Sequence, residues 1–509
     1  MVEEEQKYEV DDTYVLPDLS PVAPAGGRVR ALPPVTLVAR YLDTVDLRLA
    51  RAGASLRHRK GDELPWTVKL PTGTPGVRHE ISRPGPKGQP PPELVELVTA
   101  LHRGAPLAPV TVVRTVRHAH EVCDEAGTVL VEVVDDRVRV LDASGTATDA
   151  FRELEVELKS GDRELLERAG SVLREAGARG GSFTPKHVRA LGPAAQADPD
   201  LVAPARLPDD PSAGDVVTEA VRKEVRRLLT HDPLVRLRAP AATGDTGDTA
   251  VHQMRVACRR LRSDLRTFQP LVRKSWSRPL RDELHWLAGV LGAARDAEVL
   301  RERLRGTADA DPLSPLDAGA VDRLDEALAA RQRVAHAAID EALRSPRYLA
   351  LVDALVLAAR APRLTRRAAT PAARALPKLV ARPWRRLTGP DGVDGLDPSS
   401  PDARWHAVRK QGKQTRYAVN AVAPAVDRAA RRLSRALAGV QDVLGEHQDA
   451  AVAADTWLEL AAERPADHEV AVTAGRLAER ERESVRLMRA RFPAAWHRAT
   501  RRRRTRWLP

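Results

Sequence analysis

The sequence predicts a two-domain protein in which an α+β domain is followed by an all-α domain. Three observations lead to this prediction. The chain has 509 residues, more than one ordinary hydrophobic core holds. Short segments rich in β-branched residues and separated by Gly, Pro and Asp dominate up to about residue 190. After a Pro-rich stretch that pattern stops, and long Ala/Leu/Arg segments follow, with apolar residues three and four apart.

The first domain contains a run of predicted strands with two predicted helices. The spacing of apolar residues predicts helices over 92–104 and 162–177. The predicted strands cover residues 35–44, 54–60, 65–71, 77–82, 110–122, 128–140 and 151–159, with a further one at 1–10. The stretch 192–215 is rich in Pro, Ala and Asp, as expected of an exposed linker. We therefore place the first domain at 1–195, a linker at 196–211 and the second domain at 212–509.

Charged residues alternate along the predicted strands, so each strand gives charge to one face. A sheet with apolar residues against helices and charges inward describes a barrel with a polar lumen. An antiparallel sheet with an open, solvated face is the alternative. Alternation does not decide between Asp135 and Asp136. The residues that carry the pattern are Glu3, Glu5, Lys7, Arg57, Arg59, Lys69, Arg78, Glu80, Arg114, Arg117, Glu132, Asp136, Glu153, Glu155 and Glu157.

One pattern of cationic residues occurs twice in the sequence of the all-α domain. His252, Arg255, Arg259 and Arg262 align with His406, Arg409, Lys413 and Arg416, and a Leu/Gly-rich segment follows each copy at nearly the same distance. Sustained spacing of this kind predicts a duplicated helical unit with two halves packed together. Offsets of 0, 3, 7 and 10 residues span an arc of roughly 80° on a helix, so each copy forms a ridge. Arg266 continues the first ridge.

The overall charge points to a polyanionic partner. The net charge is +12 and the pI about 10, which suits nucleic acid, an anionic membrane or a phosphate polymer. Aromatic residues make up 3%, which disfavours nucleic acid because single-strand binders stack bases on rings. No apolar run reaches the roughly 20 residues that span a bilayer, and the N-terminus does not resemble a signal peptide. Cys123 and Cys258 are too few for a disulfide framework or a zinc site. We expect a cytoplasmic protein without a membrane partner.

A ridge of arginines has two interpretations. It forms a solvated face paired with carboxylates of neighbouring helices, or it binds an extended polyanion. Two copies at one spacing favour the second interpretation, because arginine forks bind phosphate oxygens in pairs. The arginine-rich tail at 501–506 adds charge and is expected to be a solvated terminus that could still touch polyanions.

The segment 251–268 with its downstream "LGAARDAEV" resembles the CHAD domain, a duplicated α-helical module, over roughly 212–509. The resemblance implies binding of inorganic polyphosphate. Lys413 and Gln414 replace the arginine pair of the first copy, so we expect a weaker second ridge. The candidate polyphosphate-binding residues are His252, Arg255, Arg259, Arg262, Arg266, His406, Arg409, Lys413 and Arg416.

The pattern E-x-E-x-K at Glu3, Glu5 and Lys7 resembles the CYTH superfamily of triphosphate tunnel metalloenzymes. Supporting matches are "YLDT", "LRHR", "TVKLP", "RTVR", "VVDDRV", "ELEVEL" and Lys186 in "SFTPK", in the family's order. The resemblance implies an eight-stranded antiparallel tunnel that hydrolyses triphosphate compounds with Mg²⁺ or Mn²⁺, hard cations that carboxylate oxygens suit. A CYTH domain joined to a CHAD domain is also a known bacterial architecture.

The resemblance implies three groups of site residues. Metal candidates are Glu3, Glu5, Glu153, Glu155 and Glu157. Phosphate-binding candidates are Arg57, Arg59, Lys69, Arg78, Arg114, Arg117 and Lys186. Catalytic candidates are Lys7, near the attacked phosphorus, with Glu132 and Asp136.

Four functions compete. The first is a metal-dependent hydrolase of inorganic triphosphate or a related compound, with a polyphosphate-binding module. The second is a non-catalytic protein that binds polyphosphate at polyphosphate granules. An adenylyl cyclase and a general nucleic-acid binder are the third and fourth. The complete set of charged positions favours the first.

Overall fold

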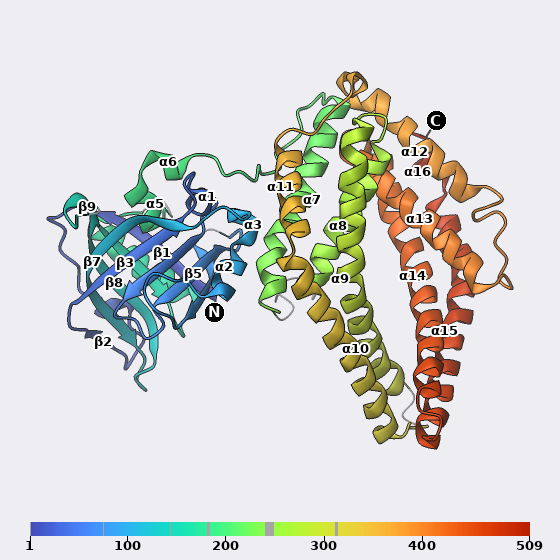
Figure 1. Ribbon diagram of the computed structural model, residues 1–509, viewed down its shortest axis with the longest axis horizontal. Helices are drawn as coiled ribbons and strands as arrows, with labels where there is room; N and C mark the ends of the chain where they lie inside the picture. Colours follow the sequence, from blue (N-terminus) through green and yellow to red (C-terminus); the bar gives the residue numbers. More distant parts are fainter. Residues whose placement is uncertain are drawn as a thin grey trace. The chain divides into compact units, whose positions relative to one another are not determined.

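A computed structural model describes residues 2–74, 76–142, 144–180, 184–239, 249–310 and 314–508, and the side chains of Val2 and Glu3 are outside the described part. The chain forms two compact units, residues 1–201 and 202–509. The first is a β-barrel with short helices and the second is entirely helical (Figure 1). This arrangement confirms the predicted fold class.

Eight antiparallel strands close the barrel in the order β1-β6-β5-β4-β3-β7-β8-β9, and β9 pairs back with β1. Closure removes every open edge of this ring. Two short strands lie outside it: β2 (Arg28–Ala31) pairs with β7, and β10 (Arg179–Gly180) pairs with β1. The ring strands are β1 (Val2–Val10), β3 (Val35–Asp43), β4 (Ser55–Lys60), β5 (Trp66–Pro71), β6 (Val77–Arg83), β7 (Ala108–Cys123), β8 (Val129–Leu141) and β9 (Ala147–Leu158).

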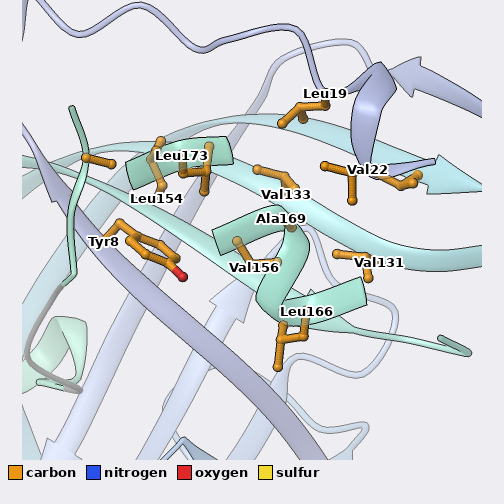
Figure 2. Close-up of a cluster of buried hydrophobic side chains, with 12 residues drawn as sticks. Tyr8, Leu19, Val22, Val131, Val133, Leu154, Val156, Leu166, Ala169 and Leu173 are labelled. Atoms are coloured by element: carbon orange, nitrogen blue, oxygen red, sulfur yellow. The ribbon is translucent and has the colours of Figure 1, made fainter. Parts of the chain in front are cut away.

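Alternation gives β8 and β9 an apolar outer face and a charged inner face. Val131, Val133, Leu154 and Val156 are buried together outside the barrel, under helix α4 (Arg163–Glu175), as Figure 2 shows. The helix begins where the Asp162 carboxylate accepts a hydrogen bond from the Leu165 N–H. The intervening residues of both strands therefore point into the barrel.

Short helices and turns accompany the barrel. They are η1 (Ser20–Val22), α1 (Arg48–Arg51), α2 (Pro92–Leu97), α3 (Thr99–His102), α5 (Lys186–Leu191) and α6 (Pro193–Gln196). An apolar cluster made by Tyr41, Val113, Val138, Val140 and Phe151, with Ala39, fills part of the interior. Helix α5 packs against β7, and its Ala190 lies against that cluster. The remaining interior is polar.

The second unit repeats one helical pattern. Its helices are α7 (Ala213–Arg236), α8 (Ala250–Thr267), α9 (Lys274–Ala308), α10 (Ala318–Arg344), α11 (Pro346–Arg360), α12 (Ala372–Thr388), α13 (Asp402–Val422), α14 (Arg428–Ala462), α15 (His468–Ala499) and α16 (Arg502–Thr505), with 3-10 turns η2 (Arg366–Ala369) and η3 (Ala423–Ala425). The pair α8–α9 corresponds to α13–α14, and α9 and α14 are both 35 residues long.

Burial confirms the duplication position by position. A shift of 154 residues carries the buried positions 251, 254, 257, 258, 261, 264 and 265 of α8 onto 405, 408, 411, 412, 415, 418 and 419 of α13, all buried. A shift of 153 carries 280, 284, 287, 291, 294 and 297 of α9 onto 433, 437, 440, 444, 447 and 450 of α14, also all buried. The two helical pairs therefore bury the same faces.

Candidate functional site

A cavity of about 350 Å³ lies inside the barrel and has a strongly charged wall. Among the described residues that line it, eight cations face five carboxylates, an excess of positive charge that suits an anionic ligand. The cations are Lys7, Arg57, Arg59, Lys69, Arg78, Arg117, Lys159 and Lys186, and the carboxylates are Glu5, Glu80, Glu132, Glu155 and Glu157.

Strand register brings opposite charges together. Lys7 of β1 stands opposite Glu155 of β9, and Arg117 of β7 stands opposite Asp136 of β8. The Arg117 guanidinium donates two hydrogen bonds to the Asp136 carboxylate, at 2.9 and 2.6 Å. Its Nη2 also donates to Glu155 Oε2 at 3.1 Å. Pairing of this kind holds the arginine fork rigid against the barrel wall.

Lys186, the first residue of α5, lies at the centre of the carboxylates. Its Nζ is 2.7 Å from Asp136 Oδ2, 2.8 Å from Glu153 Oε1 and 2.8 Å from Glu155 Oε1. Lys7 Nζ also contacts Glu155, and it lies 3.5 Å from Glu5 Oε1. Two ammonium groups thus share the carboxylates that the sequence assigned to metal.

These contacts fix the ionisation of the buried groups. Burial by itself raises the pKa of Asp136, but Lys186 and the hydrogen bonds and charge of Arg117 bring it below its usual value. Burial likewise raises the pKa of Glu155, and Lys186, Lys7 and Arg117 together hold it well below its usual range. Both carboxylates therefore stay ionised at neutral pH, and Asp136 has no exposed surface.

Most of the predicted residues reach the cavity. The lining includes Glu5, Lys7, Arg57, Arg59, Lys69, Arg78, Arg117, Glu132, Glu155, Glu157 and Lys186. Glu153 and Asp136 are buried beside it through their ion pairs with Lys186. The Glu3 side chain lies outside the described residues.

Arg114 and Asp135 point away from the cavity. Arg114 is exposed and absent from the cavity wall, because three positions separate it from Arg117 and an odd separation on a strand reverses the face. Asp136 points inward, whereas Asp135 pairs with Arg152 outside, its Oδ2 2.7 Å from Arg152 Nη2. The structure thus settles the choice that alternation left open.

The lining also includes Lys159, Tyr41 and His187, which were not predicted. Lys159 Nζ lies 2.7 Å from Glu157 Oε1 and 3.3 Å from Glu132 Oε2, and its position two residues after Glu157 was an available signal. Tyr41 stacks on His187 of α5, with ring centroids 5.0 Å apart. Nothing in the local sequence connects these two rings.

Several cations lie near the stacked rings of Tyr41 and His187 and affect their pKa values. Burial, then the charges of Arg78, Arg57 and Lys7, bring the pKa of His187 to about 3, although its Nε2 lies 3.1 Å from the Ala54 carbonyl oxygen. Burial raises the pKa of Tyr41, but the charge and hydrogen bond of Arg57 outweigh it and lower the value. His187 is therefore neutral at pH 7.

The carboxylate set suits a hard divalent cation by its chemistry. Glu153 Oε1 is buried and makes no hydrogen bond of good geometry, although Lys186 Nζ lies 2.8 Å away. Within the described residues, however, no three acidic, His or Cys side chains are arranged around a metal position. Spacings of 2.7–2.8 Å around Lys186 suit an ammonium group rather than Mg²⁺, whose oxygen ligands lie at about 2.1 Å.

In the helical unit the two ridges converge. The charges that act on Lys413 come from Arg259 and Arg255 of α8 and from Arg409 and Arg416 of α13. Each ridge has one matching acid: Arg255 Nη1 lies 3.1 Å from Asp296 Oδ1, and Arg409 Nη2 lies 3.8 Å from Asp449 Oδ1. Asp296 and Asp449 correspond under the shift of 153 residues.

Like charges crowd around Lys413. Burial, then Arg259, Arg409, Arg255 and Arg416, lower its pKa to about 7. Burial and Arg255, Arg409 and Arg262 also lower the pKa of Arg259. The described ridge residues are partly exposed and Arg266 is exposed, which leaves them open to a ligand.

The first ridge continues onto α9 in a way the sequence did not suggest. Arg262 contacts the His285 ring, and burial and the charges of Arg266, Arg262 and Arg278 lower the pKa of Arg281. In the second half, Asn420 takes the place of Arg266 and bonds Ser434 instead. Of the two predicted ridge histidines, His406 bonds Gln448, and His252 is partly buried.

Comparisons with known proteins agree with this division. The CYTH domain model matches residues 3–186 and the CHAD domain model matches residues 219–458. Two uncharacterized proteins of Mycobacterium tuberculosis strains, MT2285 and Rv2226, are each 32% identical over 97% of this chain and 95% of their own length. The chain belongs to the CYTH–CHAD family of fusion proteins.

Solved structures resemble parts of this CYTH–CHAD protein. PptA from Streptomyces chartreusis is 27% identical, with a TM-score of 0.45, over 56% of this chain and 99% of its own. The CHAD domain from the plant Ricinus communis is 24% identical, with a TM-score of 0.44, over 58% of this chain and 94% of its own. CYTH domains are metal-dependent and include triphosphatases and adenylate cyclases, and CHAD domains are associated with polyphosphate binding. None of the described helices combines the length and apolar character needed to cross a membrane.

Proposed function

We propose that the barrel hydrolyses inorganic triphosphate or a related triphosphate compound with Mg²⁺ or Mn²⁺, and that the helical unit binds inorganic polyphosphate. One observation carries the first part: inside the closed ring of strands, a cavity whose wall has more cations than carboxylates lies against a buried carboxylate cluster. An excess of cations suits a polyphosphate anion, and the carboxylates suit the divalent cation that accompanies it.

The chain's cations would bind and orient the phosphates. Arg57, Arg59, Lys69, Arg78, Arg117 and Lys186 come from four strands and a helix, and they surround the cavity from several sides. Guanidinium forks grip phosphate oxygens in pairs, and fixed cations stabilise charge on a transferring phosphoryl group. Lys7 lies among the carboxylates, where its ammonium would face the attacked phosphorus.

Most of the carboxylates would have one of two roles, binding the metal or positioning cations. Glu5, Glu153 and Glu155 would hold the metal, and Glu157 is a further candidate ligand. Glu3 is assigned to the same group because it belongs to the E-x-E-x-K motif. The metal, when bound, would neutralise phosphate charge and lower the barrier to attack by water. Asp136 is ionised, fully buried and bonded to Arg117, so we assign it to positioning that arginine and Lys186.

Glu132 remains as the candidate that accepts a proton from water. It lines the cavity opposite Glu157, and Lys159 Nζ lies 3.3 Å from its Oε2. The lysine would direct this carboxylate along the wall. Glu132→Gln should therefore lower the rate of phosphate release more than it changes KM.

The deciding experiment is phosphate release from tripolyphosphate, thiamine triphosphate and long-chain polyphosphate, with Mg²⁺, Mn²⁺ or a chelator present. The proposal expects release from at least one of these that stops in chelator. A lack of release from all of them, with polyphosphate still bound, would favour the second candidate.

That second candidate is a non-catalytic protein that binds polyphosphate, with a place on polyphosphate granules. The observation in its favour is Lys186, whose ammonium already pairs with two of the carboxylates assigned to the metal, Glu153 and Glu155, as well as with Asp136. The adenylyl cyclase reaction and general nucleic-acid binding gain no such support from the cavity or the ridges.

Support for polyphosphate binding comes from the convergence of the two ridges on one place. Reversing the charge of Arg255 and Arg259 should weaken binding of long-chain polyphosphate much more than binding of duplex DNA, since a duplex needs a broader footprint. The same change at Arg409 and Lys413 should have a smaller effect, because Lys413 carries only part of a charge at neutral pH.

A further inference from the structure

The helical unit contains a third cationic region, whose lining residues differ from those of the barrel cavity and from the predicted ridge residues. An open hollow of about 540 Å³ is lined by Arg432, Arg435, Ala436, Arg503 and Arg504. The first two arginines lie near the start of α14, and the last two lie in α16, which packs against α14. We call these four arginines the C-terminal arginine cluster.

The duplication does not explain this cluster. Under the shift of 153 residues that superposes the buried faces of α9 and α14, Arg432 corresponds to Pro279 and Arg435 to Asp282. The first half therefore has no cations at the equivalent positions. In addition, α16 begins at Arg502, well beyond residue 458 where the match to the CHAD family ends.

The cluster also lacks the acids that accompany other arginines of this unit. Arg301 pairs with Asp325, and Arg303 pairs with Glu446 and Glu481. In the described part of the chain, by contrast, no carboxylate lies within 4.0 Å of the guanidinium groups of the cluster. The repulsion among the four guanidinium groups is therefore not offset by neighbouring carboxylates of the described residues.

The fold nevertheless holds these cations together. The Trp507 indole N–H donates to the Arg504 carbonyl oxygen at 2.8 Å, and the Arg504 guanidinium bonds the Arg498 carbonyl oxygen. Burial and the charges of Arg503, Arg501, Arg432 and Arg498 lower the pKa of Arg504. Such crowding is offset when an anion with several negative charges enters.

The geometry points to a phosphate polymer as that anion, and we propose that the C-terminal arginine cluster is a second binding site for inorganic polyphosphate. The lining holds guanidinium groups and one alanine, without a ring on which a nucleobase could stack. Guanidinium forks grip phosphate oxygens in pairs. The identity of the polymer rests on the proposed function of the helical unit, but the site is separate from the ridges.

Two sites on one unit would act together on a long chain. When one segment of polyphosphate occupies the ridges, another segment of the same molecule meets the cluster at a high effective concentration. Loss of the cluster should then weaken binding of long chains, and it should lower the salt dependence of that binding because fewer counterions are released.

The test uses the full chain with two variants and a control. Arg503→Glu/Arg504→Glu alters one wall of the hollow, and Arg432→Glu/Arg435→Glu alters the other. Arg366→Glu/Arg367→Glu changes the net charge equally at two exposed neighbours in η2 that do not line the hollow. Each protein is titrated with long-chain polyphosphate and with single-stranded DNA over a range of salt, and thermal unfolding checks that each is folded.

Both cluster variants should bind polyphosphate roughly tenfold more weakly than the control variant, with a smaller salt slope. Equal affinity of either cluster variant and the control would overturn this inference alone. An equal loss of DNA binding would also overturn it, since the cluster would then be a general polyanion surface. Absence of polyphosphate binding by the unaltered chain would instead refute the proposed function on which the inference rests.

Discussion

Lys413 provides a sharp test of the ridge because its charge depends on pH in the physiological range. Its ammonium faces Arg255 and Arg259 of α8, Arg409 and Arg416 of its own helix, and Asp449 of α14, which bears the opposite charge. Burial and the four arginines bring its pKa to about 7. A phosphate chain over the ridge would replace repulsion by attraction, so bound Lys413 should regain its ordinary pKa near 10.5.

The magnitude follows from linkage. A group whose pKa rises on binding takes up a proton, and binding weakens as pH rises through the pKa of the free protein. Between pH 6 and pH 8, a free pKa of about 7 and a bound pKa above 9 give a loss of affinity of about tenfold, or roughly 1.4 kcal/mol. At pH 8 about 0.9 proton should be taken up for each polyphosphate segment bound at the ridge.

Calorimetric titration with long-chain polyphosphate in buffers of different ionisation enthalpy measures this uptake. Lys413→Arg is the control, because arginine stays charged throughout and the variant should bind with little proton uptake at pH 8. Equal uptake by the variant would assign the effect to other groups, the histidines first among them. No uptake by the unaltered chain would mean that Lys413 is already charged or lies away from the polymer.

Three further perturbations test other parts of the molecule. Glu5→Gln should abolish metal-dependent phosphate release while polyphosphate binding by the helical unit stays the same, as parallel assays on one preparation can show. Lys186→Ala should raise Mn²⁺ affinity by roughly tenfold or more in calorimetric titration, because it removes an ammonium 2.7–2.8 Å from three carboxylates; unchanged affinity would place the metal elsewhere. Tyr348→Phe should destabilise the helical unit by about 1–3 kcal/mol in denaturant unfolding, since its hydroxyl donates to the fully buried Asp232 at 2.5 Å; a change below 0.5 kcal/mol would contradict a structural role for this bond.

The sequence predicted the barrel wall well where charges stand two residues apart. Arg57 and Arg59, or Glu155 and Glu157, must share a face because the side-chain period of a strand is two. Arg114 and Arg117 break that rule, and only one of them could point inward. The register of β7 against β8 decides which, since Arg117 stands opposite Asp136 and bonds it. Pairing between strands is a long-range property that alternation along one strand does not contain.

Contacts between segments that lie far apart in the chain could not be predicted from the sequence. His187 meets Tyr41 only because α5 packs on the barrel, and Lys186 reaches three carboxylates for the same reason. The duplication, in contrast, was visible because both copies repeat their buried positions. The change of shift from 154 to 153 residues explains why the second half is one residue shorter between its histidine and its glycine-rich segment. The loss falls in the connection between the two helices and leaves both faces intact.

The two units offset the repulsion of their cations differently, and this difference predicts a different response to a chelator. In the barrel, Lys186 and Lys7 are bonded to Glu155 and its neighbours, so a phosphate that takes these ammonium groups leaves buried carboxylates without partners. Unpaired buried charge is costly, and a divalent cation would remove that cost. Phosphate and metal should therefore bind to the barrel together.

On the helices, each ridge has one acid within ion-pair distance among the described residues, Asp296 or Asp449, so polyphosphate needs no metal there. A chelator should thus abolish binding of tripolyphosphate to the barrel while binding of long-chain polyphosphate to the whole protein persists. A variant that combines Arg255→Glu/Arg259→Glu with Arg409→Glu/Lys413→Glu and Arg503→Glu/Arg504→Glu keeps the barrel intact and isolates the first effect in a calorimetric titration with tripolyphosphate. Undiminished binding of tripolyphosphate to that variant in chelator would show that the cations of the barrel release their carboxylates without help, and the coupling argued here would be wrong.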